Sequence, residues 1–109
     1  MSDLAMDQRQ KKVKELRETI KELREHLNKK SHPPKELSNC IYTLYEGLVD
    51  LVSATIKSKT KEYDEATAAM EEAAAKTKKA VDDLSKVEDA IKMVAKAIEK
   101  VATLLAAVS

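Results

Sequence analysis

The side chains most able to do chemistry lie in one short stretch of this 109-residue chain. Residues 26–42, HLNKKSHPPKELSNCIY, hold both histidines, both prolines and the only cysteine. A cysteine and two histidines are acceptable zinc ligands, so His26, His32 and Cys40 are the candidates for a metal site. Their spacing matches no recognised metal motif, because Cys-x-x-Cys and His-Glu-x-x-His are both absent. The sequence therefore predicts no metal site beyond these three weak candidates.

No group of residues in the sequence matches a known catalytic arrangement. Catalysis by Cys40 would require a histidine that a third group orients, and His26 is the one histidine that a helical hairpin would place opposite it. The chain has a single glycine, so it lacks the glycine-rich loops that hold phosphates. Carboxylate pairs such as Glu71 and Glu72 are neighbours on a helix and point apart. We therefore expect no catalytic residue, no cofactor, no small-molecule substrate and no enzymatic activity.

The elements around the histidines and the cysteine are predicted to form an antiparallel helical hairpin. In residues 4–30, apolar side chains recur at alternating steps of three and four, as in a coiled-coil seam. Pro33 disfavours helix at His32, and Pro34 suits the first turn of a new helix. We predict the first helix over 4–30, the turn over 31–34 and the second helix over 35–57. This hairpin would bring His26 and Cys40 close together.

The rest of the chain has neither glycine nor proline after Gly47, and its apolar pattern is regular. From Tyr63 to Val108 the steps alternate between three and four without a change of phase. Because a turn usually resets that phase, we predict one long helix over residues 61–107. The alternative is an up-down-up-down four-helix bundle with a break near residues 77–83, where Asp82 would cap the next helix. Both versions are all-α and treat residues 1–109 as a single helical domain.

Composition and charge narrow the classes of function. The net charge is +1, which gives no support to nucleic-acid binding. Residues 1–35 carry ten Lys or Arg against six Asp or Glu, a balance of +4, so a basic first helix faces a more acidic remainder. The start, MSDLAMDQRQ, is polar, and the longest nearly apolar run, VATLLAAV, is far shorter than a membrane span of ~20 residues. We therefore expect a cytoplasmic protein.

The last part of the chain is the predicted contact surface. Its apolar residues have heptad spacing, and they extend further than a short hairpin can cover. The residues of this C-terminal seam are Leu84, Val87, Ile91, Val94, Ile98, Val101, Leu105 and Val108. The seam predicts a non-enzymatic helical interaction protein (an adaptor, chaperone or assembly subunit) that self-associates or binds partner helices. The alternatives are an amphipathic protein of a membrane or lipid surface and a designed helical bundle without a biological function.

Overall fold

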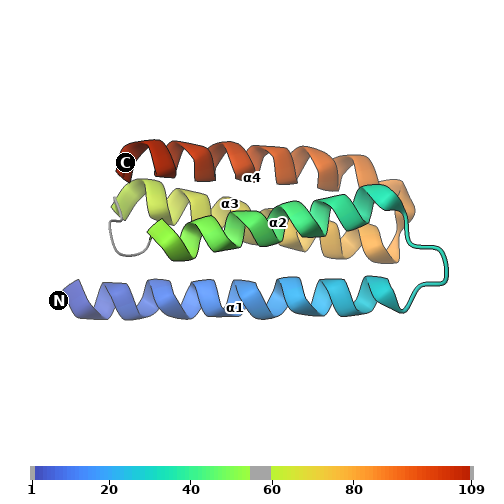
Figure 1. Cartoon of the computed structure of the whole chain (residues 1–109), viewed down its shortest axis with the longest axis horizontal. Coiled ribbons are helices and arrows are strands. Elements are labelled where there is room, and N and C mark those ends of the chain that lie inside the picture. The colour runs from blue at the N-terminus through green and yellow to red at the C-terminus, as the bar shows by residue number, and fades with distance from the viewer. Residues whose placement is uncertain (1, 55–59, 109) are drawn as a thin grey trace.

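The computed structural model describes residues 2–54 and 60–108, with side chains described for 9–54 and 61–107. These residues form α1 (Ser2–Asn28), α2 (Lys35–Ala54), α3 (Thr60–Asp82), the short 3-10 helix η2 (Leu84–Lys86) and α4 (Val87–Val108). No strand occurs among the described residues. The predicted all-α class is confirmed, and the fold is a four-helix bundle (Figure 1).

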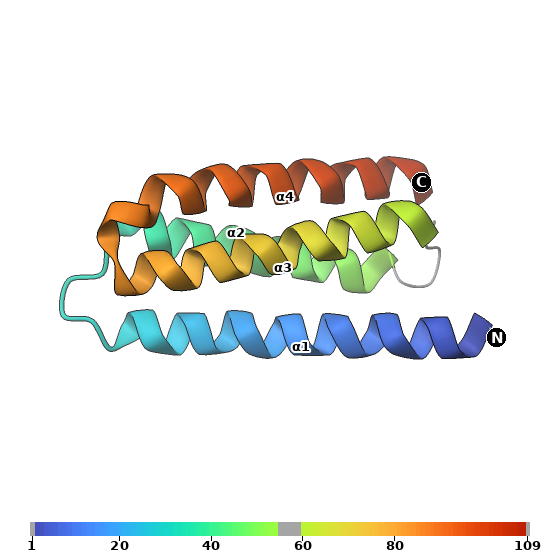
Figure 2. The ribbon, with the colours of Figure 1, turned by 180° about the vertical axis from the view of Figure 1, so that it is seen from behind.

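The α-helices alternate in direction and pack in three layers (Figure 1, Figure 2). α2 and α3 lie side by side in the middle layer, α1 covers one side of this pair, and α4 covers the other. The middle pair thus separates α1 from α4. α2 is consequently packed against three helices, and one side of it remains open to solvent.

The first two helices form the predicted hairpin. The Lys30 N–H donates to the Leu27 carbonyl at 3.0 Å beyond the last residue of α1. The Pro34 carbonyl accepts the Leu37 N–H at 3.1 Å and so begins α2. The buried seams of the hairpin are Val13, Leu16, Ile20, Leu23 and Leu27 in α1 and Leu37, Ile41, Leu44, Leu48 and Leu51 in α2. The α1 seam follows the predicted spacing, and the α2 seam has the same alternating steps; the predicted end of the second helix at residue 57 lies outside the described residues.

The predicted single helix over residues 61–107 is wrong, and the alternative with a break near 77–83 is right. α3 ends at Asp82, and Asp83 takes an extended backbone conformation with φ −140° and ψ 102°. The Asp83 carboxylate accepts hydrogen bonds from the Ser85 N–H at 3.1 Å and from the Ser85 hydroxyl at 2.7 Å. Asp83, rather than the predicted Asp82, is therefore the capping residue.

The chain folds back at Asp83 because burial outweighs the continuity of the heptad pattern. A helix over residues 61–107 would be ~70 Å long, whereas the bundle measures 47 Å along its longest axis. Part of the seam of such a helix would have stayed in water. Folding back buries it, and small side chains let the helices approach closely. These buried alanines are Ala66, Ala73, Ala74 and Ala80 in α3 and Ala90 and Ala97 in α4.

α2 approaches two of its neighbours closely at Gly47. A Cβ atom added there would lie 2.9 Å from Cε of Met70 in α3 and 3.1 Å from Cδ1 of Ile98 in α4. Distances this short leave no room for a larger side chain without movement of Met70, which is fully buried. Gly47 lowers the helix propensity of α2 by about 1 kcal/mol relative to Ala. Because it has no side chain, three helices can meet at this point.

The first prediction concerns this contact. We expect Gly47→Val to lower the free energy of unfolding by about 1–3 kcal/mol, because the added carbons overpack a filled core. The measurement is urea denaturation followed by circular dichroism. The control is Ser53→Val on the same helix, at an exposed position, where the change should be within about 0.5 kcal/mol. Equal effects of the two substitutions would contradict the close packing at Gly47.

The second prediction concerns the cap at the fold-back. Hydrogen bonds from the Ser85 hydroxyl and then from its N–H hold the pKa of the Asp83 carboxyl below its ordinary value. Because the folded-state pKa is the lower one, the stabilisation is present above the ordinary pKa of about 3.9 and is lost as the pH falls through the folded-state pKa. Asp83→Asn keeps the cap but cannot ionise. We therefore expect the stability advantage of the parent chain over Asp83→Asn to shrink in thermal melts below about pH 4.

Ser85→Ala serves as the matched variant for the cap. It keeps the Asp83 carboxylate but removes the hydroxyl donor, so its pH dependence should be weaker than that of the parent chain and stronger than that of Asp83→Asn. Identical pH profiles for all three proteins would show that the Asp83 carboxylate does not hold the corner.

Candidate interaction surface

The three candidate metal ligands differ in their exposure and in their partners. His26 is exposed near the end of α1, and its Nε2 atom lies 3.0 Å from Oδ1 of Asp82 in α3. His32 is exposed in the connection between α1 and α2, and Cys40 is buried. Among the described residues, no three His, Cys, Asp or Glu side chains are grouped so as to hold a metal ion. The hairpin therefore directs His26 to a carboxylate of α3.

Cys40 belongs to the hydrophobic core. Burial raises the pKa of its thiol, and the nearby Glu36 carboxylate raises it further. A thiol with a raised pKa carries little of the thiolate form that acts as a nucleophile or metal ligand. Cys40 therefore behaves as a small apolar side chain.

The C-terminal seam is divided between the inside and the outside of the bundle. Val94 and Val101 are buried, whereas Leu84 and Ile91 are exposed. Val87, Ile98 and Leu105 are partly buried against the core, and the side chain of Val108 lies outside the described ones. The buried line of α4 is instead Ala90, Val94, Ala97, Val101 and Leu104. That the C-terminal seam binds a partner stays a prediction, and five of its residues already pack within or against the core of the chain.

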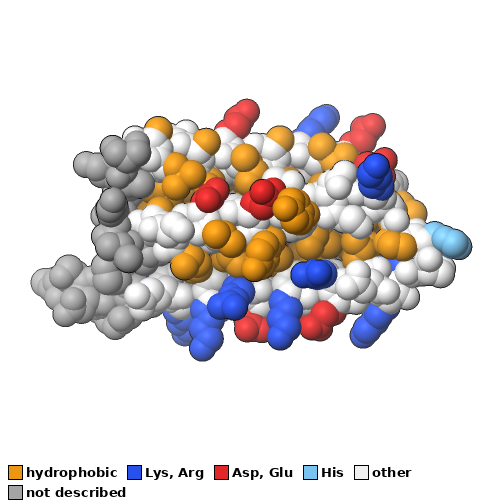
Figure 3. Space-filling model, viewed as in Figure 1, with side chains coloured by type: hydrophobic (Ala, Val, Ile, Leu, Met, Phe, Trp, Pro, Cys, Tyr) orange, Lys and Arg blue, Asp and Glu red, His pale blue; other side chains and the backbone are white. Residues whose placement is uncertain are grey.

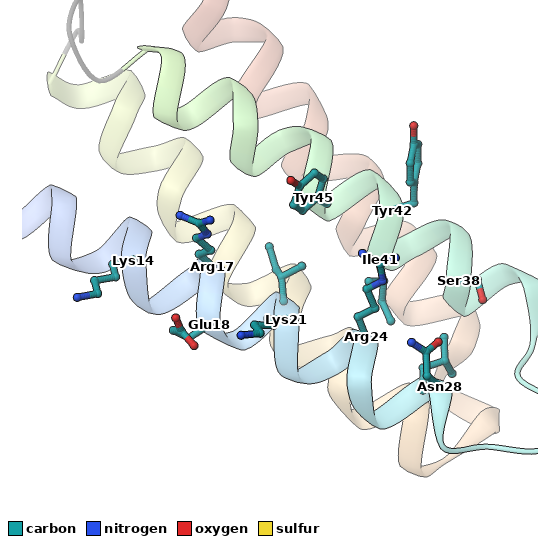
Figure 4. A pocket seen from close by; sticks show the side chains of 12 residues that line it. Lys14, Arg17, Glu18, Lys21, Arg24, Asn28, Ser38, Ile41, Tyr42 and Tyr45 are labelled. Atoms are coloured by element: carbon teal, nitrogen blue, oxygen red, sulfur yellow. The ribbon is translucent and has the colours of Figure 1, made fainter.

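A groove of about 710 Å³ runs between α1 and α2 (Figure 4). Its apolar lining comes from Ile20, Leu27 and Ile41, which belong to the buried seams. On the α1 side it is lined by four basic residues, Lys14, Arg17, Lys21 and Arg24, and by one acidic residue, Glu18. Figure 4 shows Arg17 and Arg24 extending from α1 toward α2. The groove thus has an apolar interior and a predominantly basic edge.

The α2 side of the groove continues into an exposed apolar stripe. Tyr42 is 66% exposed, Tyr45 53%, Val49 47% and Val52 52%. We call these four residues the outer stripe of α2. Their steps of three, four and three are those of a helix–helix seam, and a second hollow of about 220 Å³ beside them is lined by Arg17, Tyr45, Val49 and Val52 among others. α2 therefore carries one buried seam and a second seam that is exposed.

Acidic residues lie on the far side of the outer stripe. At ~100° per residue, Glu46 and Asp50 follow the stripe around α2 on the side away from α1. Neither forms a salt bridge with a described residue. Figure 3 shows this face: orange side chains along the middle, mainly blue ones with some red among them below over α1, and two red groups within the middle band, with orange, red and blue side chains above them. We call the basic edge, the outer stripe and the acidic pair together the front face.

The sequence pattern alone does not separate this surface from the core. The positions of Tyr45, Val49 and Val52 also fit a widening of the buried stripe of α2, because sequence spacing does not show how far neighbouring helices extend over it. The useful signal was the spacing of Tyr42, Tyr45, Val49 and Val52 among themselves. A second heptad seam on a helix that already has a buried one indicates a second contact.

Comparison with protein-family models, with curated proteins and with solved structures finds no match to this chain. Within the part of the chain that the structure describes, no helix combines the length and the apolar character that crossing a bilayer requires.

The third prediction tests the assignment of Cys40 to the core. We expect the native thiol to react with Ellman's reagent at pH 8 on the order of 100-fold more slowly than in denaturant, since reaction requires opening of the helix packing. The control is Asn39→Cys in a Cys40→Ala background, whose thiol lies at an exposed position one residue away. Equal rates for the two thiols would contradict the buried position of Cys40.

Proposed function

We propose that this chain is a non-enzymatic helical interaction protein, of the adaptor, chaperone or assembly-subunit kind, and that it binds a protein helix at the front face. The single observation that carries the proposal is the outer stripe of α2. Isolated exposed apolar residues are common on proteins, but a contiguous apolar patch with a polar rim is typical of an interaction site. Here the patch is continuous, has helix–helix spacing and lies beside a groove.

The energetic argument supports a contact of useful strength. Complete burial of a large apolar side chain contributes about 1.5–3 kcal/mol, so covering four half-exposed ones is on the order of 3–6 kcal/mol. The stripe also contributes two tyrosines, a residue type enriched where proteins bind each other. The basic edge on α1 then selects among partners by charge, because like charges across an interface are unfavourable.

The C-terminal seam is the second surface considered for a partner, and it is less well suited. Val94 and Val101 cannot contact a partner without opening the bundle, since both are buried. Leu84 and Ile91 are exposed, but Leu84 lies in η2 and Ile91 in α4, so they do not share one helix. The front face offers a longer uninterrupted seam on a single helix.

A membrane or lipid surface is the alternative partner. The basic edge beside an apolar stripe would suit anionic headgroups. Glu46 and Asp50 on the same face oppose this, because an anionic surface repels them, and no Trp or Phe is present to anchor the face. Co-sedimentation with phosphatidylcholine–phosphatidylserine vesicles at low salt tests the alternative. A cytoplasmic location is part of the proposal for a protein partner.

The fourth prediction tests the proposed function. Tyr45→p-benzoylphenylalanine places a photo-crosslinking side chain in the outer stripe, and the control Lys92→p-benzoylphenylalanine places it at an exposed position on the outer side of α4. We expect illumination, of the purified chain or of an extract of its native cells, to give a polypeptide adduct at position 45 and none at position 92. A further Val49→Glu substitution should abolish the adduct, because it introduces a charge into the contact.

The thermal stability of each variant is measured in parallel. Val49→Glu should leave the melting temperature of the isolated chain almost unchanged, because Val49 is half exposed. Equal labelling from positions 45 and 92, or no labelling from either, would overturn the proposed function.

A further inference from the structure

We infer that the helix bound at the front face is α2 of a second copy of this chain, aligned parallel to the first. The inference deepens the proposed function and rests on it. It is carried by the order of charges across the front face, which makes that face complementary to itself in one orientation and repulsive to itself in the other.

The charges change sign across the outer stripe. The α1 edge carries Lys14, Arg17, Lys21 and Arg24, with Glu18 as the acidic exception. The opposite edge carries Glu46 and Asp50, which are free of salt bridges to described residues. Crossing the face from α1 to the far side of α2, one therefore meets basic, apolar and then acidic side chains.

Two copies related by a two-fold axis place the same patch on itself. If the axis lies in the interface along the helices, the two α2 helices run parallel, and the basic edge of each copy meets the acidic edge of the other. If the axis lies across the helices, they run antiparallel, and basic edge meets basic edge. The apolar stripes meet in both cases, so charge decides for the parallel arrangement.

The levels of the charged groups along the bundle agree with the parallel arrangement. Arg17 lines the same hollow as Tyr45 and Val49, so it lies at the height of that part of α2. Glu46 follows Tyr45 directly in the sequence. Rotation about an axis parallel to the helices leaves the position of every residue along the bundle unchanged. Glu46 of the second copy therefore lies at the level of Arg17 of the first copy.

The outer stripe is short enough for one second copy to cover it. The stripe runs ~15 Å along α2, whereas the bundle measures 47 × 22 × 16 Å and the front face is the one seen down the shortest axis. One copy therefore covers the whole outer stripe of the other.

The fifth prediction uses disulfide trapping to read the alignment. In a Cys40→Ala background, Tyr42→Cys and Val52→Cys place single thiols near opposite ends of the outer stripe, ~15 Å apart along α2. A disulfide requires Cα atoms within about 7 Å. In the parallel dimer each variant alone should form a covalent dimer on mild oxidation. In an antiparallel dimer neither variant alone should, but their mixture should.

A charge exchange tests the contact that sets the alignment. Arg17→Glu and Glu46→Arg should each weaken the dimer about tenfold in sedimentation equilibrium, because each places like charges together twice per dimer. The double variant restores opposite charges and should return within about threefold of the parent dissociation constant. Lys92→Glu, on the outer side of α4, is the control and should leave the constant unchanged; circular dichroism verifies that every variant is folded.

The outcomes separate this inference from the proposed function. A chain that is monomeric at millimolar concentration, yet gives an adduct with a different polypeptide at position 45, overturns the second copy as partner and leaves the proposed function standing. A monomer with no adduct at all overturns both. Trapping only in the mixture of Tyr42→Cys and Val52→Cys, or weakening without restoration in the double variant, overturns the parallel alignment.

Discussion

The meeting of three helices at Gly47 is the contact on which the rest of the structure depends. With no side chain on α2 at this point, Met70 of α3 and Ile98 of α4 both reach its backbone. This fixes α2 in the middle layer, with α4 on one side and α1 on the other (Figure 1). Because α1 and α4 cannot also cover the fourth side of α2, its outer stripe stays in contact with solvent.

α1 supplies charge to the open side while it is held to the bundle from the other. Arg9 reaches α3, where its Nε lies 3.2 Å from Asp64 Oδ1 and its guanidinium lies over the Tyr63 ring at 5.8 Å from the centroid. Near the other end of α1, His26 contacts Asp82, which also belongs to α3. The buried seam of α1 orients the helix so that its basic residues line the groove, and these two contacts add ties between α1 and α3.

The fold-back shows where local sequence signals and packing disagree. Residues 61–107 have good helix formers and an unbroken heptad phase, both of which favour one helix. Asp83 and Ser85 form a cap that is weak as a sequence signal, since the neighbouring Asp82 is an equally good candidate. The free energy gained by burying α4 against α2 and α3 outweighs these local preferences. The heptad phase does not reveal the fold-back, because the residues that α4 buries are only partly those of the predicted seam. The buried line of α4 is Ala90, Val94, Ala97, Val101 and Leu104.

The sequence by itself determined the features that depend on neighbours in the chain. These are the all-helical class, the turn at Pro33 and Pro34, the inward seams of the hairpin and the absence of a recognised catalytic or metal motif. The tertiary structure decided where the last helix breaks, which residues of the C-terminal seam are buried, and that the outer stripe of α2 lies between a basic and an acidic edge. The physical reason is that periodicity shows which side of a helix is apolar, whereas only the packing of other helices shows how much of that side is covered.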